Sequence, residues 1–116
     1  MNPGEADPPS DFGAVLSELD ATIRARRGAD PSVSYVASLL AKGTDASLKK
    51  IGEEAAEVLI AAKNGDPAPL VHELADLWFH CLVLMTERDI PLSALAQELA
   101  RRRGRSGLDE KASRPR

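Results

Sequence analysis

Apolar residues recur along this chain three and four positions apart, the spacing that places them on one face of an α-helix. Glycines, prolines and aspartates stand between these segments, where they end one helix and begin the next. The pattern predicts five helices: about 12–27, a short one through Val36, Leu39 and Leu40 that stops near Gly43, and about 46–64, 67–88 and 92–103. Because no competing strand pattern occurs, the predicted fold class is all-α, a bundle of four to five helices.

Capping residues indicate where the helices begin. Asp11, Asp45 and Asp66 each precede a periodic segment and can accept hydrogen bonds from the first free N–H groups. Residues 1–10 hold three prolines and a glycine, and we expect them to form a flexible leader. The domain then covers residues 11–116. From about residue 104 it has a basic tail without a clear period, which we expect to be irregular.

The composition is that of one globular domain of 116 residues, with 43% hydrophobic and 28% charged residues. The single cysteine, Cys81, excludes an internal disulfide framework and a four-cysteine zinc site. We find no apolar run approaching the ~20 residues that span a bilayer, and no secretory signal at the start. We therefore expect a cytoplasmic protein outside the membrane.

Charge is distributed unevenly. Residues 1–100 carry a net charge of −8, and residues 101–116 carry +5. An acidic body argues against nucleic-acid binding, because the phosphate backbone requires a basic surface. Its carboxylates attract cations instead. The basic tail either meets an anion or solvates the end of a helix.

The third predicted helix separates into an apolar and an acidic face. The apolar face contains Leu48, Ile51, Ala55, Val58, Leu59 and Ala62. Roughly opposite lie Lys50, Glu53, Glu54 and Glu57. Three glutamates on one arc repel one another on an isolated helix. This arc is therefore either a solvated charged face or part of a binding site.

The fourth predicted helix is apolar on almost every side, which indicates that it is buried by several neighbours. Glu73, Asp76 and His80 nevertheless fall on one arc of it. Carboxylates on a mostly buried helix cost free energy unless an arginine, a shared proton or a divalent cation neutralises them. A buried salt bridge to another helix is the alternative. His80 is either a hydrogen-bonded core residue or a partner of Asp76, and His72 is expected on the surface.

A short break joins these two helices, which predicts an antiparallel hairpin with Glu54 and Glu57 set against Glu73 and Asp76. Carboxylates on facing helices are a known way to build a metal site in a bundle. Oxygen-only ligands favour Mg²⁺, with Mn²⁺ as the alternative, over zinc. Because Mg²⁺ accepts phosphate oxygens as further ligands, the pattern indicates a nucleotide or other polyphosphate substrate.

The spacing Glu54-x-x-Glu57 followed by Glu73-x-x-Asp76 resembles the ExxE…ExxD motif of the MazG-type all-α nucleotide pyrophosphohydrolases. Longer segments resemble the phosphoribosyl-ATP pyrophosphatase family more specifically. These are SYVASLLAKG (34–43), KKIGEEAAEVLIAAKNGD (49–66), HELADLWFHCLVLMTERDIPL (72–92) and GRSGLDEKASR (104–114). The resemblance covers about residues 12–114.

This resemblance implies Mg²⁺-dependent hydrolysis of phosphoribosyl-ATP to phosphoribosyl-AMP and pyrophosphate in histidine biosynthesis. It implies an α-helical bundle completed by homodimerisation, in the stand-alone form, because the chain has no room for a fused cyclohydrolase domain. The apolar circumference of the fourth helix independently favours a homodimer, since the short helices of one chain cannot cover it.

Each candidate site residue then has an expected role. The expected Mg²⁺ ligands are Glu54, Glu57, Glu73 and Asp76. Glu53 and Glu54 are the candidate catalytic carboxylates, although Glu53 is equally an added ligand, a general base or a surface residue. The candidates for holding phosphates are, in order, Lys50, Lys42 and the tail residues Arg105, Ser106 and Lys111.

Two other functions are compatible with the same residues. One is a MazG-type house-cleaning (d)NTP pyrophosphohydrolase, with the same metal site and a different pocket for base and sugar. The other is a non-enzymatic helical dimerisation module, in which the acidic residues serve as ion pairs.

Overall fold

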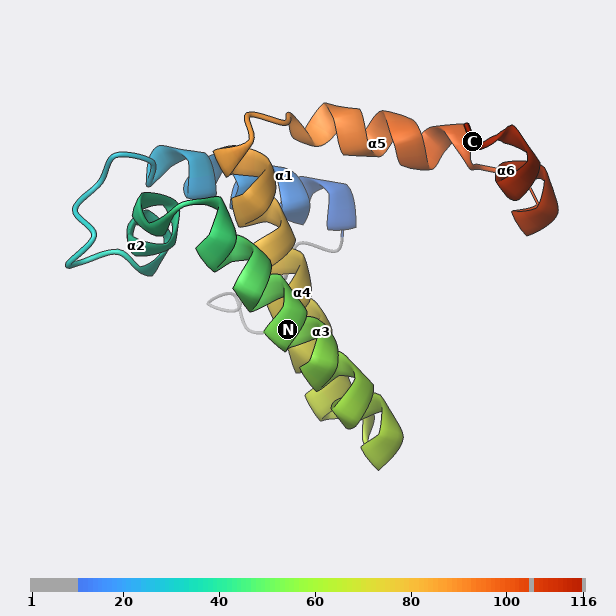
Figure 1. The fold of residues 1–116 in the computed structure, drawn as a ribbon, viewed down its shortest axis with the longest axis horizontal. Coiled ribbons are helices and arrows are strands. Elements are labelled where there is room, and N and C mark those ends of the chain that lie inside the picture. Colours follow the sequence, from blue (N-terminus) through green and yellow to red (C-terminus); the bar gives the residue numbers. More distant parts are fainter. Residues whose placement is uncertain (1–10, 105, 116) are drawn as a thin grey trace, which may run out of the picture.

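A computed structural model of the chain describes residues 11–104 and 106–115, which form six helices (Figure 1). The helices are α1 (Phe12–Ala25), α2 (Tyr35–Lys42), α3 (Thr44–Asn64), α4 (Pro67–Glu87), α5 (Leu92–Arg101) and α6 (Gly107–Ser113). No strand occurs in these described ranges, and the predicted all-α class is confirmed. The predicted leader, residues 1–10, lies outside the described residues.

Two of the predicted caps are present. The Asp11 carboxylate accepts a hydrogen bond of 2.9 Å from the backbone N–H of Gly13 at the start of α1. The Asp66 carboxylate accepts one of 3.1 Å from Ala68 at the start of α4, with Pro67 as the first helical residue. These caps satisfy N–H groups that have no partner within the helix.

The prediction that Asp45 caps α3 is wrong, because α3 begins at Thr44, two residues before the predicted start at residue 46. Gly43 occupies the cap position with φ 89°, a conformation that favours glycine and lets α2 end where α3 begins. No side chain caps α3, but its first turn contacts the end of α4. There the Glu87 carboxylate accepts hydrogen bonds from the hydroxyls of Thr44 and Ser47. A negative charge at a helix N-terminus is favourable.

The tail is not irregular as predicted, because residues Gly107–Ser113 form α6. Ser106 accepts a hydrogen bond of 3.0 Å from the backbone N–H of Asp109, and two acidic residues stand in the first turn. Glu110 also pairs with Arg101 of α5 at 2.7 Å. The signal for this helix was in the sequence: Ser106 followed three positions later by Asp109 is a helix-start pattern.

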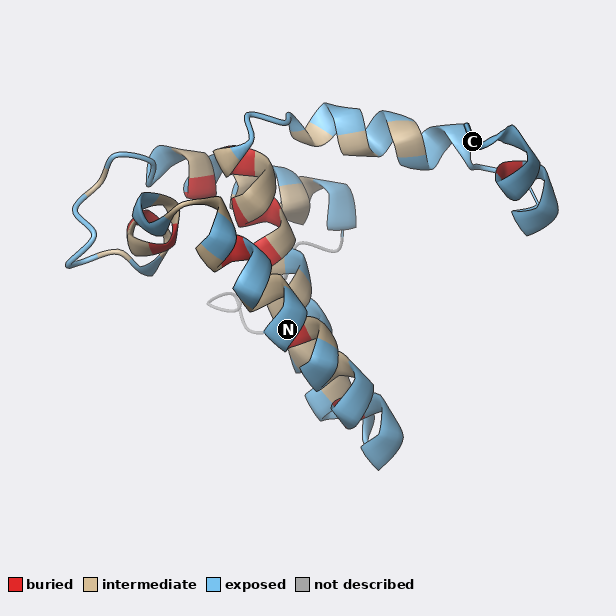
Figure 2. Ribbon diagram, viewed as in Figure 1, coloured by how far each residue is buried: buried red, intermediate tan, exposed pale blue. Residues whose placement is uncertain are grey.

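The core lies where α1, α2 and the C-terminal half of α4 meet, the region with most of the buried positions in Figure 2. Ile23 from α1, Leu39 from α2, and Leu82 and Val83 from α4 are buried there. The predicted apolar stripes of α1 and α2 supply the surrounding residues: Leu16, Leu19, Val36 and Leu40. This core anchors one end of α4.

The most extensive helix contact joins α3 and α4, the predicted hairpin (Figure 1). The expected inner face of α3 is wrong in part. Its buried residues are Ser47, Glu54 and Ala61, seven positions apart, whereas Leu48 and Leu59 are 50% and 69% exposed. The helix therefore turns carboxylates toward α4 and leaves much of its apolar stripe outward, because the stripe lacks a partner within the described chain.

Contrary to expectation, α4 is long and apolar enough to cross a membrane by length and composition. Core helices of soluble proteins have the same properties, and this one carries Glu73 and Asp76 and contacts α1, α2 and α3. Only 17% of its apolar window is buried inside the chain. The predicted burial of α4 is therefore reached only in part among the described residues.

Candidate metal centre between α3 and α4

Carboxylates from both helices of the hairpin lie close together. Glu54 and Glu57 of α3 and Glu73 of α4 each offer a carboxylate oxygen, and these oxygens lie within 4.8 Å of one another. Glu73 also lies in a second such group with His72 and Asp76. The structure thus brings the four predicted carboxylates to one region, with Glu73 common to both groups.

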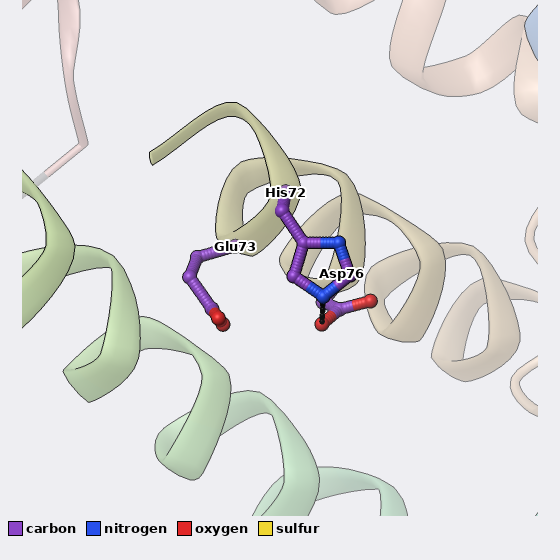
Figure 3. A group of neighbouring side chains, drawn as sticks. All are labelled: His72, Glu73 and Asp76. Atoms are coloured by element: carbon purple, nitrogen blue, oxygen red, sulfur yellow. Dashed lines mark ion pairs between the residues drawn. The ribbon is translucent and has the colours of Figure 1, made fainter. Parts of the chain in front are cut away.

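Helix geometry explains this arrangement. A spacing of three residues places Glu54 and Glu57 one turn apart on α3, and Glu73 and Asp76 one turn apart on α4. Figure 3 shows Glu73 extending from α4 toward α3, while His72 lies over Asp76 on the same helix. The His72 Nε2 atom lies 3.4 Å from an oxygen of Asp76. His72 is exposed as expected, although it contacts a candidate ligand.

The Glu73 carboxylate is electrostatically unsatisfied. Its Oε2 atom is buried and has no hydrogen-bond partner among the described residues. Desolvation, followed by the charge of Glu57 and a hydrogen bond with it, raises the pKa of Glu73 above its ordinary value, while His72 opposes this rise. A proton or a cation would stabilise such an acceptor beside like charges.

A divalent cation fits this set of donors. Octahedral Mg²⁺ binds oxygens at about 2.1 Å, which places two ligand oxygens about 3–4 Å apart. The Glu54, Glu57 and Glu73 oxygens, within 4.8 Å of one another, approach that spacing. All three are hard carboxylate donors, which favour Mg²⁺ or Mn²⁺ over softer metals.

Lys50 borders the carboxylates, as predicted. Its Nζ atom lies 3.4 Å from a Glu54 oxygen and 3.9 Å from a Glu53 oxygen. Burial disfavours the charged amine, but Tyr35 and the carboxylates of Glu54 and Glu53 outweigh it and raise the pKa of Lys50. Glu54 is buried, whereas Glu53 is exposed and lies outside both carboxylate groups.

The remaining phosphate-binding candidates are separated. Lys42 ends α2 and lines the same cavity as Lys50. Ser106 and Lys111 belong to α6 and its cap, at the far end of α5 from the hairpin (Figure 1). Arg105 lies outside the described residues. Within one chain, α6 is therefore not brought to the carboxylates.

His80 is a hydrogen-bonded core residue, the first of the two predicted alternatives. Its Nδ1 atom lies 2.8 Å from the backbone oxygen of Asp76. His80 therefore contacts the backbone of Asp76 and not its carboxylate. Its Nε2 atom lies 3.1 Å from the hydroxyl of Tyr35. Tyr35 is not among the predicted site residues, because nothing in its spacing indicates that α2 carries it to α4.

Helices with carboxylates gathered between two of them are the arrangement expected of the all-α nucleotide pyrophosphohydrolases. The model of the family described as phosphoribosyl-ATP pyrophosphohydrolase matches residues 16–103. The chain belongs to this phosphoribosyl-ATP pyrophosphohydrolase family, a family of hydrolases that act on a phosphoanhydride. The resemblance stated from the sequence is confirmed.

Relatives named phosphoribosyl-ATP pyrophosphatase match nearly the whole chain. The Bordetella bronchiseptica protein is 53% identical over 112 residues, covering 94% of this chain and 97% of that protein. The Neisseria gonorrhoeae protein is 55% identical over 101 residues, covering 87% and 94%. The Nitrosospira multiformis protein is 55% identical over 100 residues, covering 86% and 83%.

Proposed function

We propose that the chain hydrolyses phosphoribosyl-ATP to phosphoribosyl-AMP and pyrophosphate in histidine biosynthesis. The observation that carries this proposal is the approach of Glu54, Glu57 and Glu73 within 4.8 Å, beside Lys50. Such a group suits a cation and a polyphosphate together. Family membership and the relatives' names supply the substrate.

Glu54, Glu57, Glu73 and Asp76 would hold a divalent ion, Mg²⁺ by preference and Mn²⁺ as the alternative. The buried Oε2 atom of Glu73 and its raised pKa support this assignment, because a cation relieves both. When bound, such an ion neutralises phosphate oxygens and acidifies a water ligand.

Side chains of this protein would supply proton transfer, ion binding and phosphate binding. In the reaction, a water oxygen bonds to phosphorus, the bond between the α- and β-phosphates breaks, and a carboxylate accepts the water's proton. Glu53 and Glu54 are the two candidates for this proton transfer, because both carboxylates lie beside Lys50 at the site. Glu54, which is buried and paired with Lys50, suits ion binding. Lys50 and Lys42 suit the phosphates.

A pyrophosphate-release assay on phosphoribosyl-ATP, with and without Mg²⁺, tests this function. We expect pyrophosphate release only when phosphoribosyl-ATP and Mg²⁺ are both present. The kcat/KM for phosphoribosyl-ATP should lie well above that for ATP and the deoxynucleoside triphosphates. Preference for the ordinary nucleotides would identify the house-cleaning alternative. Absence of both Mg²⁺ binding and pyrophosphate release would identify the non-enzymatic dimerisation module.

We also propose a homodimer in which α5 and α6 of one chain reach the hairpin of the other. Three observations support it: α4 lacks cover, α5 has no buried residue, and large apolar side chains are exposed. These include Leu59, Ile60, Val71, Trp78 and Leu99. In this arrangement Ser106 and Lys111, and Arg105 between α5 and α6, would meet phosphates at the partner's carboxylates.

We infer a cytoplasmic protein that binds neither nucleic acid nor membrane. The acidic body supports the first exclusion, with its net charge of −8 over residues 1–100. Two carboxylates on α4, turned toward a polar site, support the second, because ionised groups facing lipid are costly.

Deleting residues 104–116 should raise KM for phosphoribosyl-ATP roughly tenfold, because charge-assisted hydrogen bonds to phosphate are worth about 1.5–3 kcal/mol. Steady-state kinetics and circular dichroism check this, and we expect helix loss confined to the seven residues of α6. The single variant Lys111→Ala should show a smaller rise. An unchanged KM in the deletion variant would remove the tail from the site.

A further inference from the structure

A second polar feature adjoins the carboxylates. A cavity of about 350 Å³ lies between α2 and the N-terminal half of α3. Its polar lining consists of three lysines (Lys42, Lys49 and Lys50), the Glu53 carboxylate and the side chain of Tyr35. Lys50 pairs with Glu53 and Glu54, so Lys42 and Lys49 give the lining a net positive charge beside an otherwise acidic site.

Lys50 connects this cavity to the candidate metal centre. It lines the cavity, and its Nζ atom lies 3.4 Å from Glu54, which belongs to the carboxylate group of the hairpin. A molecule in the cavity therefore lies next to whatever the carboxylates hold. The two sites suit two parts of one polyphosphate, one near the ion and one among the lysines.

Tyr35 is fixed at the cavity by a partly buried chain of hydrogen bonds. A backbone oxygen only accepts, so the Nδ1 atom of His80, 2.8 Å from the Asp76 oxygen, carries the ring hydrogen. In the neutral ring Nε2 then accepts from the Tyr35 hydroxyl at 3.1 Å. The hydroxyl proton is thereby committed to His80. The phenol oxygen retains lone pairs that can accept from an ammonium group but not from a phosphate.

Because the Tyr35 hydroxyl donates its hydrogen to His80, the geometry points to a contact of the phenol oxygen with a lysine and not with a phosphate. Tyr35 and Lys50 line the same cavity. The ring of Tyr35 also stacks on Phe79 of α4, with centroids 6.4 Å apart and an interplanar angle of 16°. Two contacts with α4 thus hold the phenol oxygen in place, and it can orient the flexible amine of Lys50.

Resting on the function proposed above, we propose that this cavity is the subsite for the departing pyrophosphate, with Tyr35 as a residue that positions Lys50. Three lysines suit the most densely charged part of the substrate, which is the triphosphate rather than a single sugar phosphate. Because Lys50 joins the cavity to the metal centre, the phosphates in the cavity must be bonded directly to the phosphate that water attacks. The β- and γ-phosphates meet both conditions.

Titration of the full chain with inorganic pyrophosphate in the presence of Mn²⁺ tests the subsite. We expect Lys49→Ala and Lys42→Ala each to weaken pyrophosphate binding about tenfold. The matched control is Lys63→Ala, an exposed lysine in the last turn of α3, outside the cavity. Its affinity should equal that of the wild type. Equal affinities for Lys49→Ala, Lys42→Ala and Lys63→Ala would overturn the subsite.

Tyr35→Phe tests the positioning role, because it removes one hydroxyl and keeps the ring. We expect product inhibition by pyrophosphate to weaken about threefold to tenfold, and KM to rise more than kcat falls. His80→Gln should produce the same change, and the double variant no more than either, since both act through one hydrogen bond. Wild-type inhibition in Tyr35→Phe would overturn this role.

Metal binding separates this test from that of the function itself. Mn²⁺ titrated alone should bind Tyr35→Phe and Lys49→Ala as it binds the wild type. Normal metal binding and hydrolysis with unchanged pyrophosphate affinities would overturn only the subsite. A wild-type chain that neither binds Mn²⁺ nor releases pyrophosphate from phosphoribosyl-ATP would overturn the function on which it rests.

Discussion

Glu57→Gln should lower kcat/KM for phosphoribosyl-ATP by at least about 10²–10³-fold, the range seen when one charge-stabilising group is removed from an active site. Glu57 is exposed, so the change leaves the helix core untouched. Glutamine has the same shape without the charge, and a hard divalent ion loses one ligand oxygen of a carboxylate group. Steady-state kinetics at saturating Mg²⁺ provide the measurement.

The matched control for this variant is Glu18→Gln, an exposed glutamate on α1 outside both carboxylate groups. It should retain wild-type kinetics. Circular dichroism and molar mass should be unchanged in both variants. Near-normal activity of Asp76→Asn at saturating Mg²⁺ would show that the assignment of ligands is wrong.

Glu57→Gln should also change how strongly Mg²⁺ stabilises the folded protein. The raised pKa of Glu73 means that ionising this group opposes folding as pH rises through that pKa, and Glu57 is one cause of the rise. Without metal, Glu57→Gln should therefore be at least as stable as the wild type at neutral pH. Mg²⁺ should raise the melting temperature of the wild type and have little effect on the variant.

Leu59→Glu should convert the proposed homodimer to monomers and abolish activity with it. Leu59 is 69% exposed on the apolar stripe that α3 turns away from α4. If a second chain covers this stripe, an unpaired carboxylate buried there costs several kcal/mol, enough to weaken association at least a hundredfold. Light scattering after size exclusion, over a range of concentrations, should report one chain of 12.4 kDa where the wild type reports two.

Val33→Glu provides the control for that experiment. Val33 is 81% exposed and lies in the loop between α1 and α2, outside the apolar stripe of α3. The same chemical change there should leave mass and activity unaltered. A wild-type chain that is monomeric at micromolar concentration, or a dimeric and active Leu59→Glu, would contradict the proposed interface.

Local patterns determined most of the secondary structure. Periodic apolar residues specify the helices, and Asp66 with Pro67 starts α4 as predicted, because capping depends on the few residues around a helix end. The missed helix, α6, obeys the same local rule through Ser106 and Asp109. Spacing within α3 and α4, and the short turn between them, also sufficed to predict that their carboxylates meet.

Only the tertiary structure decided which face each helix turns inward and which distant residues touch. The apolar stripe of α3 predicted an inward Leu59, yet Glu54 is buried instead, since packing against α4 chooses the face. Tyr35 meets His80 across 45 positions of sequence, and Glu87 accepts a hydrogen bond from the hydroxyl of Thr44, 43 residues earlier. Such contacts depend on how whole helices cross in space, which the spacing of residues within one helix does not contain.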